Sequence, residues 1–504
     1  QEILFAANPS FYYYLMSTIE TARIIDRFGD SQQKKNYCEK LLNGTWAGAL
    51  SFSEERSDYD ESEIRTKAVI EKDYYRISGS KSFIIAGDHD LTENIIHLVL
   101  AKLEIDGKNQ LAVFIVPTNI QLDRKQVSNN VSIETSHQTM GLRNTSFSTI
   151  RFGDKGECKG FLLKGSGYTT DSISRSLNGI RLQIALQGVA LSGNTYYRTL
   201  HYACQEISGK SSSDNTGSLI QGAAIISYPH IADSMMFIKA LSEGIRGAVY
   251  SIAFFNDCSI HGGEEQKEFF SDLIGIYTRV LKVHATDSAL RVIKKGMNLI
   301  GRTSYFKELT LEQDYRDIQA GTLFAGVNEV IAQEFLELLF NVQEEQLLKS
   351  LLTQFNSIDV HLIKSEPLTE AVAVWQDYIG GMILLTDDLK NTLGTLKGDE
   401  KDPRQLMLYA DRILRLFGDV IICYHLICQG MEAEKKLEKA NINFFNLHQE
   451  AYRDSITMKM YNKLIAAEFF ALNVLSEHES SIRIIQKGSS SALNADLRAD
   501  IVIG

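Results

Sequence analysis

Three groups of residues have side chains that could ligate a metal ion or act as paired acids. Asp88-His89-Asp90 would lie at the end of a strand, where alternate side chains point to opposite faces. Cys423, His425 and Cys428 cannot all face one side of a helix, and Glu264-Glu265 lies among many charges, which is typical of a solvated loop. Because the ligands of a metal must converge, we expect no metal site.

The composition is typical of a folded globular protein with several domains. The 504 residues are 44% hydrophobic and 23% charged, and only five are proline. The net charge of −11 provides no broad positive field, so nucleic acid is not expected as a partner. The six cysteines form no C-x-x-C pair, and such scattered thiols favour a cytoplasmic location. We also expect no signal peptide and no membrane span, because no long uncharged apolar run is found.

The spacing of hydrophobic residues separates helical parts from a β-rich part. Spacings of three and four residues predict helices, whereas short β-rich runs between turn residues predict a central β-barrel or sandwich. The fold class is therefore mostly α with a central β-barrel domain. The predicted domains are the end of an N-terminal helical domain, the β domain, a central helical bundle, a C-terminal helical domain and a tail: residues 1–45, 46–155, 165–342, 345–486 and 487–504.

Five framework blocks carry a specific resemblance. They are a long run that follows a β-rich strand (81–102), a strand similar to Y-x-I-x-G-x-K (75–81) and an M-G turn (140–141). The other two are a helix similar to A-R-x-x-x-x-x-Q-G (180–188) and a block similar to V-R-D (315–317). Together they resemble the acyl-CoA dehydrogenase superfamily, and most closely its long branch with an extra C-terminal helical domain. The resemblance implies that family's three-domain fold, the added C-terminal bundle, and assembly as a dimer or tetramer.

The resemblance also implies a chemistry and a position for its base. Enzymes of this family oxidise the α,β bond of an acyl-CoA: a glutamate removes the α-proton, and FAD accepts the β-hydride. The glutamate lies in a Y-E-G-T loop soon after the V-R-D, and this register places Ala325 at the base position. Alanine cannot accept a proton. Glu329, one helical turn later, is the candidate substitute base, and the expected substrate positions are Tyr59, Arg181 and Phe324.

The expected FAD positions also depart from the family's pattern. Ser53 keeps the hydroxyl of the L-T-E-P loop, but Ile85 replaces a hydroxyl residue that faces flavin N5. Glu206 replaces an arginine that reaches the FAD pyrophosphate of a neighbouring subunit, and Arg302 could supply part of the lost positive charge. The full set of FAD positions implied by the resemblance is Ser53, Phe83, Ile85, Glu206, Asn298, Gly301 and Arg302.

Two functions follow from this combination of a retained framework and altered site. The first is a catalytically degenerate relative that acts as a binding, scaffold or regulatory subunit. It would be a homo-oligomer or part of a mixed complex with a paralogue or another protein. The alternative is an active FAD-dependent acyl-CoA dehydrogenase with a non-standard base such as Glu329. Acyl-CoA is a possible ligand in either case, and the net charge disfavours a third hypothesis, association with DNA.

Overall fold

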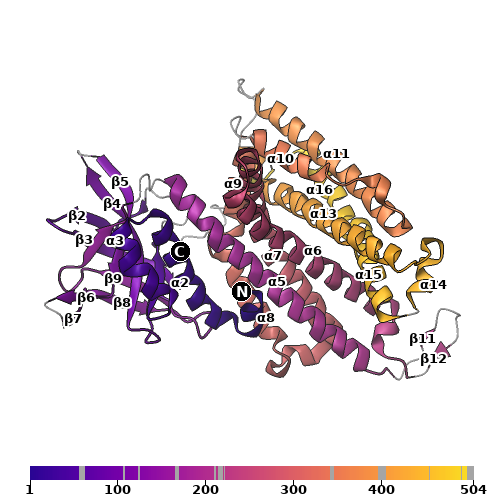
Figure 1. The fold of residues 1–504 in the computed structure, drawn as a ribbon, viewed down its shortest axis with the longest axis horizontal. Helices are drawn as coiled ribbons and strands as arrows, with labels where there is room; N and C mark the ends of the chain where they lie inside the picture. Colours follow the sequence, from indigo (N-terminus) through magenta and orange to yellow (C-terminus); the bar gives the residue numbers. More distant parts are fainter. Residues whose placement is uncertain are drawn as a thin grey trace. The chain divides into compact units, whose positions relative to one another are not determined.

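A computed structural model shows the chain as two compact units (Figure 1). Unit 1 contains Gln1–Gln187 and Gln319–Gly326, and unit 2 contains Gly188–Ile318 and Val327–Gly504. The bounds of the predicted domains stay predictions. The structure describes residues 1–55, 63–105, 108–122, 125–164, 170–208, 212–213, 219–220, 222–340, 345–394, 404–452, 454–489 and 491–496.

Unit 1 begins with helices, as predicted. The side chain of Asn8 caps α2, because its Oδ1 accepts a hydrogen bond from the Phe11 N–H at 3.0 Å. Pro9 occupies the first turn, where a missing N–H leaves no helical hydrogen bond unmade. The helices before the sheet are α1 to α4: Glu2–Ala7, Pro9–Phe28, Ser31–Gln33 and Glu39–Leu42.

The predicted β domain follows. Its main sheet has eight strands in the order β1-β4-β5-β10-β3-β9-β8, and β2 pairs with both β3 and β4. The pairings from β4 through β5, β10, β3 and β2 therefore return to β4. The strands β1 to β10 are Trp46–Ser51, Lys67–Ile70, Tyr75–Ile85, Asn94–Ile105, Lys108–Pro117, Asn119–Leu122, Lys125–Ser128, Val131–Ser136, Phe147–Phe152 and Lys159–Leu162.

Strand β4 lies between two hydrophobic cores of unit 1. Its Val99 packs into a cluster with Ile77 and Phe114, whereas the adjacent Leu98 packs into a second cluster that includes Ile25 of α2. Successive side chains of a strand point to opposite faces, so one strand supplies both clusters. Burial on both faces explains why β4 reads as a continuous apolar run rather than an alternating one.

Unit 2 consists mainly of long helices, and α6 packs along α7. Helices predicted at 171–208, 229–256, 267–300 and 327–340 are confirmed as α5, α6, α7 and α9. The described helices from α5 onward are Thr170–Gln205, Pro229–His261, Glu264–Ile300, Leu311–Leu323, Asn328–Phe340, Glu345–Phe355, Glu366–Gly394, Arg404–Met407, Ala410–Lys439, Leu447–Ala451, Ser455–Phe469, His478–Lys487 and Ser491–Asn494; the short strands β11 and β12 are Ser212–Ser213 and Leu219–Ile220.

Helix α13, Ala410–Lys439, is long and apolar enough to cross a membrane. The sequence expectation of no membrane span rested on uncharged apolar runs, and Arg415 and Asp419 interrupt the apolar run of this helix. However, 83% of its most apolar window is buried inside the protein, which is typical of a core helix. A Cβ added at Gly418 would lie 2.1 Å from Cδ2 of His284, so glycine lets α13 approach α7 closely.

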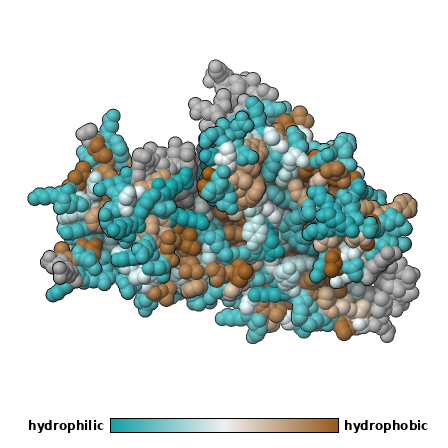
Figure 2. Space-filling view, in the orientation of Figure 1, coloured by the Kyte–Doolittle hydropathy of each residue, from teal (hydrophilic) through white to brown (hydrophobic). Residues whose placement is uncertain are grey.

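The surface is mostly hydrophilic on the face in Figure 2, and its hydrophobic patches are separate from one another. All six cysteines have free thiols. In the part of the chain that the structure describes, no group of three or more His, Cys, Asp and Glu side chains could hold a metal ion.

Candidate functional site

The loop between α8 and α9 contains the position expected for the catalytic base. Ala325 and Gly326 have φ angles of 56° and 98° in this loop. The left-handed conformation of Ala325 carries a penalty of roughly 1–2 kcal/mol that glycine would avoid. Arg181, which is buried on α5, donates a hydrogen bond from Nε to the Ala325 carbonyl oxygen at 3.3 Å. The loop is thus held by a buried guanidinium, and position 325 presents a methyl group.

Phe324 completes this group through contacts between aromatic rings. Its ring stacks on Phe147 with centroids 5.3 Å apart and meets Tyr13 edge-on at 6.3 Å. Each such pair contributes roughly 0.5–1.5 kcal/mol beyond area burial. The structure therefore brings together two of the expected substrate positions, Arg181 and Phe324, beside Ala325. The third, Tyr59, lies outside the described residues.

Glu20 on α2 is a buried carboxylate that the sequence analysis did not single out. It is 2% exposed, and Arg23 NH1 donates to its Oε1 at 2.9 Å. A Cβ added at Gly179 of α5 would lie 2.6 Å from Glu20 Oε2, so glycine gives the carboxylate room. A signal was available in the sequence: Glu20 lies four residues from Met16 and Ile24 on the apolar face of its helix.

Gln183 of α5 links Glu20 to a second buried polar group. Its Nε2 donates to Glu20, and its Oε1 accepts a hydrogen bond from the Tyr12 hydroxyl at 2.8 Å. Burial raises the pKa of the Glu20 carboxyl, while Arg23 and Gln183 act in the opposite direction. A buried carboxyl with a raised pKa can serve as an acid or a base. Arg181 and Gln183 are two residues apart, so their Cβ atoms point about 200° apart around α5.

Glu329, the predicted substitute base, lies in the first turn of α9 and is exposed. It belongs to unit 2. A carboxylate at this position interacts favourably with the N-terminal end of the helix dipole. The buried polar residue of this turn is the adjacent Asn328, which accepts a hydrogen bond from Lys282 Nζ at 2.8 Å and donates to Asp287 at 2.9 Å. The geometry of Glu329 is that of a solvated helix-terminal side chain.

Three of the predicted flavin positions lie in unit 1. The Ser53 hydroxyl donates to the Ser82 carbonyl oxygen at 2.7 Å, so its proton already has an acceptor. Phe83 has a φ of 60° at the irregular pairing of β3, is 45% exposed, and its ring lies 5.6 Å from that of His137. Ile85 has no polar side-chain atom. Of these three described positions, therefore, neither Ser53 nor Ile85 offers a hydroxyl proton to a flavin.

A buried ion pair holds the segment that carries Ser53 against β3. Lys81 Nζ donates to Glu54 Oε1 at 2.7 Å and to the Phe52 carbonyl oxygen at 3.1 Å. Burial lowers the pKa of Lys81 to about 8, although Glu54 acts in the opposite direction. This pair fixes the backbone around the expected flavin positions without offering a group to the cofactor.

The remaining predicted FAD positions lie in unit 2, at the ends of two long helices. Glu206 directly follows α5 and is exposed. Asn298 lies in the last turn of α7 and is exposed, as is Arg302 just beyond the helix. Gly301 ends α7 with a φ of 79°, a conformation that glycine adopts readily. The structure thus keeps the helix-ending glycine and leaves a carboxylate at 206.

Comparisons with known proteins agree with the observed architecture. Two family models match, "Acyl-CoA dehydrogenase, C-terminal domain" over residues 170–337 and "Acetyl-CoA dehydrogenase C-terminal like" over residues 364–496. The 3-methylmercaptopropionyl-CoA dehydrogenase of Ruegeria pomeroyi is 24% identical over 98% of this chain and 81% of its own length.

Two solved structures share the fold. ACDH-11 of Caenorhabditis elegans in complex with C11-CoA matches 97% of this chain and 75% of that chain, with a TM-score of 0.73 and 15% identity. An acyl-CoA dehydrogenase of Bacillus anthracis complexed with FAD matches 92% of this chain and 76% of that chain, with a TM-score of 0.62 and 18% identity. From these matches and the retained framework, we conclude that the chain belongs to the acyl-CoA dehydrogenase superfamily and carries an added C-terminal helical domain.

Proposed function

We propose that this protein is a catalytically degenerate acyl-CoA dehydrogenase that acts as a binding, scaffold or regulatory subunit, as a homo-oligomer or with another protein. The observation that carries the proposal is the methyl group at position 325. The surrounding loop is held by Arg181 and by the rings of Phe147 and Tyr13. Loss of a general base typically lowers a rate by about two to four orders of magnitude.

The residues at the flavin positions support the same proposal, because they fit FAD poorly. The Ser53 hydroxyl proton is directed to the Ser82 carbonyl oxygen, and Ile85 has no hydrogen-bonding side chain. A carboxylate at Glu206 would repel a pyrophosphate, since two unit charges about 4 Å apart interact by roughly 4 kcal/mol at an effective dielectric constant of 20. We therefore propose that FAD binds weakly, and we assign no reaction step to it.

A second candidate is an active acyl-CoA dehydrogenase with a different base, and buried Glu20 favours it. Relatives such as the Ruegeria pomeroyi protein are named as dehydrogenases. Burial raises the pKa of Glu20, which is the direction that favours a carboxylate as a general base. Against this assignment, Glu20 is bound through Gln183, whose Cβ leaves α5 about 200° away from that of Arg181. This geometry favours the degenerate protein as the leading proposal.

The test follows the α-protons of an acyl-CoA, because their exchange with solvent requires a base but no hydride acceptor. Butyryl-CoA is incubated with the purified chain in deuterated buffer, and loss of the α-proton signal is followed by proton NMR. We expect no exchange above background for the unaltered protein. Ala325→Glu should increase the exchange rate by about two orders of magnitude or more, whereas the matched Ala325→Gln should not.

Two further measurements distinguish the candidate functions. Absorbance between about 350 and about 500 nm reports bound oxidised flavin, and turnover is measured with added FAD and an artificial electron acceptor. Rapid exchange together with turnover in the unaltered protein would contradict degeneracy. In that case Glu20→Gln identifies the base: a loss of exchange in this variant assigns the role to Glu20.

A further inference from the structure

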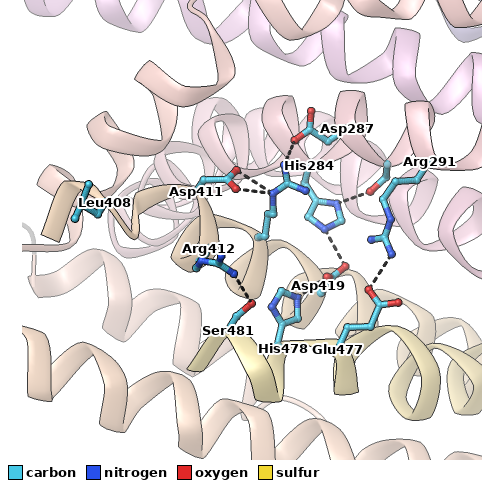
Figure 3. Close-up of a pocket in the computed structure, with 12 residues that line it drawn as sticks. His284, Asp287, Arg291, Leu408, Asp411, Arg412, Asp419, Glu477, His478 and Ser481 are labelled. Carbon is cyan, nitrogen blue, oxygen red and sulfur yellow. Dashed lines mark hydrogen bonds and ion pairs between the residues drawn. The ribbon is translucent and has the colours of Figure 1, made fainter. Parts of the chain in front are cut away.

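A polar cavity of about 590 Å³ lies in unit 2, among α7, α13 and α16 (Figure 3). None of the described residues expected to bind FAD or acyl-CoA lines it, and neither candidate function uses it. Its lining is almost entirely charged or polar: His284, Asp287, Ser288, Arg291, Leu408, Asp411, Arg412, Arg415, Asp419, Glu477, His478 and Ser481.

Asp419 lies between two imidazole rings at this cavity. His284 Nε2 is 2.8 Å from Asp419 Oδ1, and His478 Nε2 is 2.6 Å from Asp419 Oδ2. The two histidines together hold the pKa of the Asp419 carboxyl well below its usual range, although burial alone would raise it. An ionised carboxylate only accepts hydrogen bonds, so both Nε2 atoms must carry the proton.

This tautomer leaves the Nδ1 atom of each ring to find another partner. Nδ1 of His284 is 3.1 Å from the Ser288 hydroxyl. Nδ1 of His478 is buried and has no hydrogen-bond partner among the described residues. His478 as a whole is 7% exposed and lines the cavity. A buried polar atom without a partner is destabilising, and a bound ligand that supplies a hydrogen bond would relieve this.

The other carboxylates at the cavity already have cationic partners. Arg415 binds both oxygens of Asp411 at 2.9 and 3.0 Å, and its NH2 also donates to Asp287 at 3.0 Å. Arg291 donates to Glu477 at 2.9 Å. These charges largely neutralise one another, so they neither attract nor exclude an anion strongly.

Arg412 is the exception among the three arginines. It is exposed, and within the described part of the chain its hydrogen bond runs to the Ser481 hydroxyl at 3.5 Å, the limit of a useful contact. Ser481 lies one helical turn after His478 on α16. Figure 3 shows Arg412 and Ser481 on one side of the His478 ring and Asp419 above it. A guanidinium, a hydroxyl and an imidazole nitrogen are thus available for one ligand.

We propose that this cavity binds the phosphate group of a phosphate monoester. Arg412 and Ser481 donate hydrogen bonds to the phosphate oxygens, and His478 Nδ1 shares a proton with the phosphate. A phosphate monoester has a second pKa near 6, so its monoanion, which both accepts and donates hydrogen bonds, exists beside the dianion near neutral pH. A carboxylate at that pH only accepts hydrogen bonds, whereas a phosphate monoester can pair with His478 Nδ1 as donor or as acceptor. An uncharged hydroxyl would not use the charge of Arg412.

The test uses the full chain in a buffer free of phosphate. Binding of inorganic phosphate, phenyl phosphate and acetate is measured by isothermal titration calorimetry. We expect saturable binding of both phosphates and little or no binding of acetate. Tighter binding of phenyl phosphate would identify a monoester as the ligand, whereas equal affinities would identify the free anion. Either result supports the phosphate site.

Variants at the mouth of the cavity assign the binding to this site. Arg412→Ala should weaken phosphate binding about tenfold or more, the effect of losing one charge-assisted hydrogen bond. Ser481→Ala should weaken it less. Arg483→Ala is the matched control, because Arg483 lies on the same helix, is exposed and pairs with Glu479. Its phosphate affinity should be unchanged.

Three results would overturn the proposal: no saturable phosphate binding at millimolar concentration, acetate binding as tightly as phosphate, or equal affinities for Arg412→Ala and Arg483→Ala. Because Arg412 is exposed, its replacement should leave the chain folded, and the unfolding temperature without ligand checks this. The outcome is independent of the α-proton exchange test, which reports on a different part of the chain.

Discussion

The α8–α9 loop of unit 1 and the polar cavity of unit 2 contrast in what they retain. The loop keeps its packing, with Arg181 on the carbonyl of Ala325. Position 325, where the resemblance implies the family's base, carries a methyl group. The cavity is rich in ionisable groups, which form a linked set around Asp419. Under the proposed function, the comparison teaches that a fold preserves the support of a site after its reactive group is lost. Chemistry that the family pattern does not indicate can lie elsewhere in the same chain.

The strongest way to break this comparison is to remove Asp419. Asp419→Ala leaves two buried imidazole N–H groups without their shared acceptor, and each unsatisfied buried donor typically destabilises a protein by about 1–3 kcal/mol. We expect a corresponding decrease in the free energy of unfolding, measured with urea. Asp411→Ala is a suitable control, because its carboxylate is about half exposed and should contribute much less. Equal effects of the two substitutions would contradict a central role for Asp419.

Low pH should weaken the same cluster. The pKa of Asp419 is held below its ordinary value of 3.8, so its charged form stabilises the folded state above that pH. The stabilisation is lost as the pH falls through 3.8 toward the lower folded-state value. Each unit of pKa difference corresponds to about 1.4 kcal/mol. The difference in unfolding free energy between the unaltered chain and Asp419→Asn should therefore shrink at acid pH; a constant difference would argue against this linkage.

The loop of unit 1 is tested at Arg181. Arg181→Met keeps an unbranched buried side chain but removes the hydrogen bond to the Ala325 carbonyl oxygen. The expected loss of stability is about 1–3 kcal/mol, because the variant also leaves a carbonyl without its donor. Hydrogen exchange of the amides in residues 319–326 should become faster, whereas exchange around Asp419 should not change. Unchanged exchange in the loop would show that Arg181 does not hold it.

The smallest effect is expected at Glu329. Glu329→Gln removes an exposed charge near a helix N-terminus, which is worth about 0.3–1 kcal/mol at low ionic strength. The rate of α-proton exchange should be the same as in the unaltered chain. Ala325→Glu should increase that rate by the same factor whether or not Glu329→Gln is also present. Exchange in the unaltered chain that is lost in Glu329→Gln would restore Glu329 as a candidate base and weaken the contrast between the two regions.

Much of this architecture was predictable from local sequence patterns. Apolar spacing identified α5, α6, α7 and α9, since a helical face shows a period near 3.6 residues. The strands were harder to bound. The sequence predicts one β-rich run over residues 66–77, which form β2, a turn and the start of β3. It predicts no strand at the short β6, β7, β8 and β10. Short, partly exposed strands leave little periodic signal, so their pairing partners decide their extent.

The sequence identified one residue of the candidate site and missed another. The resemblance and the V-R-D block placed Ala325 in register, and the structure puts it in the loop between α8 and α9. Glu20 was missed because a single acidic residue on an apolar helix face is easily taken for a solvated one. The partners that bury it, Gly179 and Gln183, lie far along the chain.

The sequence by itself determined the helical and β-rich segments, the family resemblance and the absence of a carboxylate at position 325, because each depends on residue types at short or fixed spacing. Only the tertiary structure decided which distant side chains meet. His284, Asp419 and His478 come from three different helices, and no local pattern relates them. Their burial, and therefore their protonation and available hydrogen bonds, depends on how α7, α13 and α16 pack.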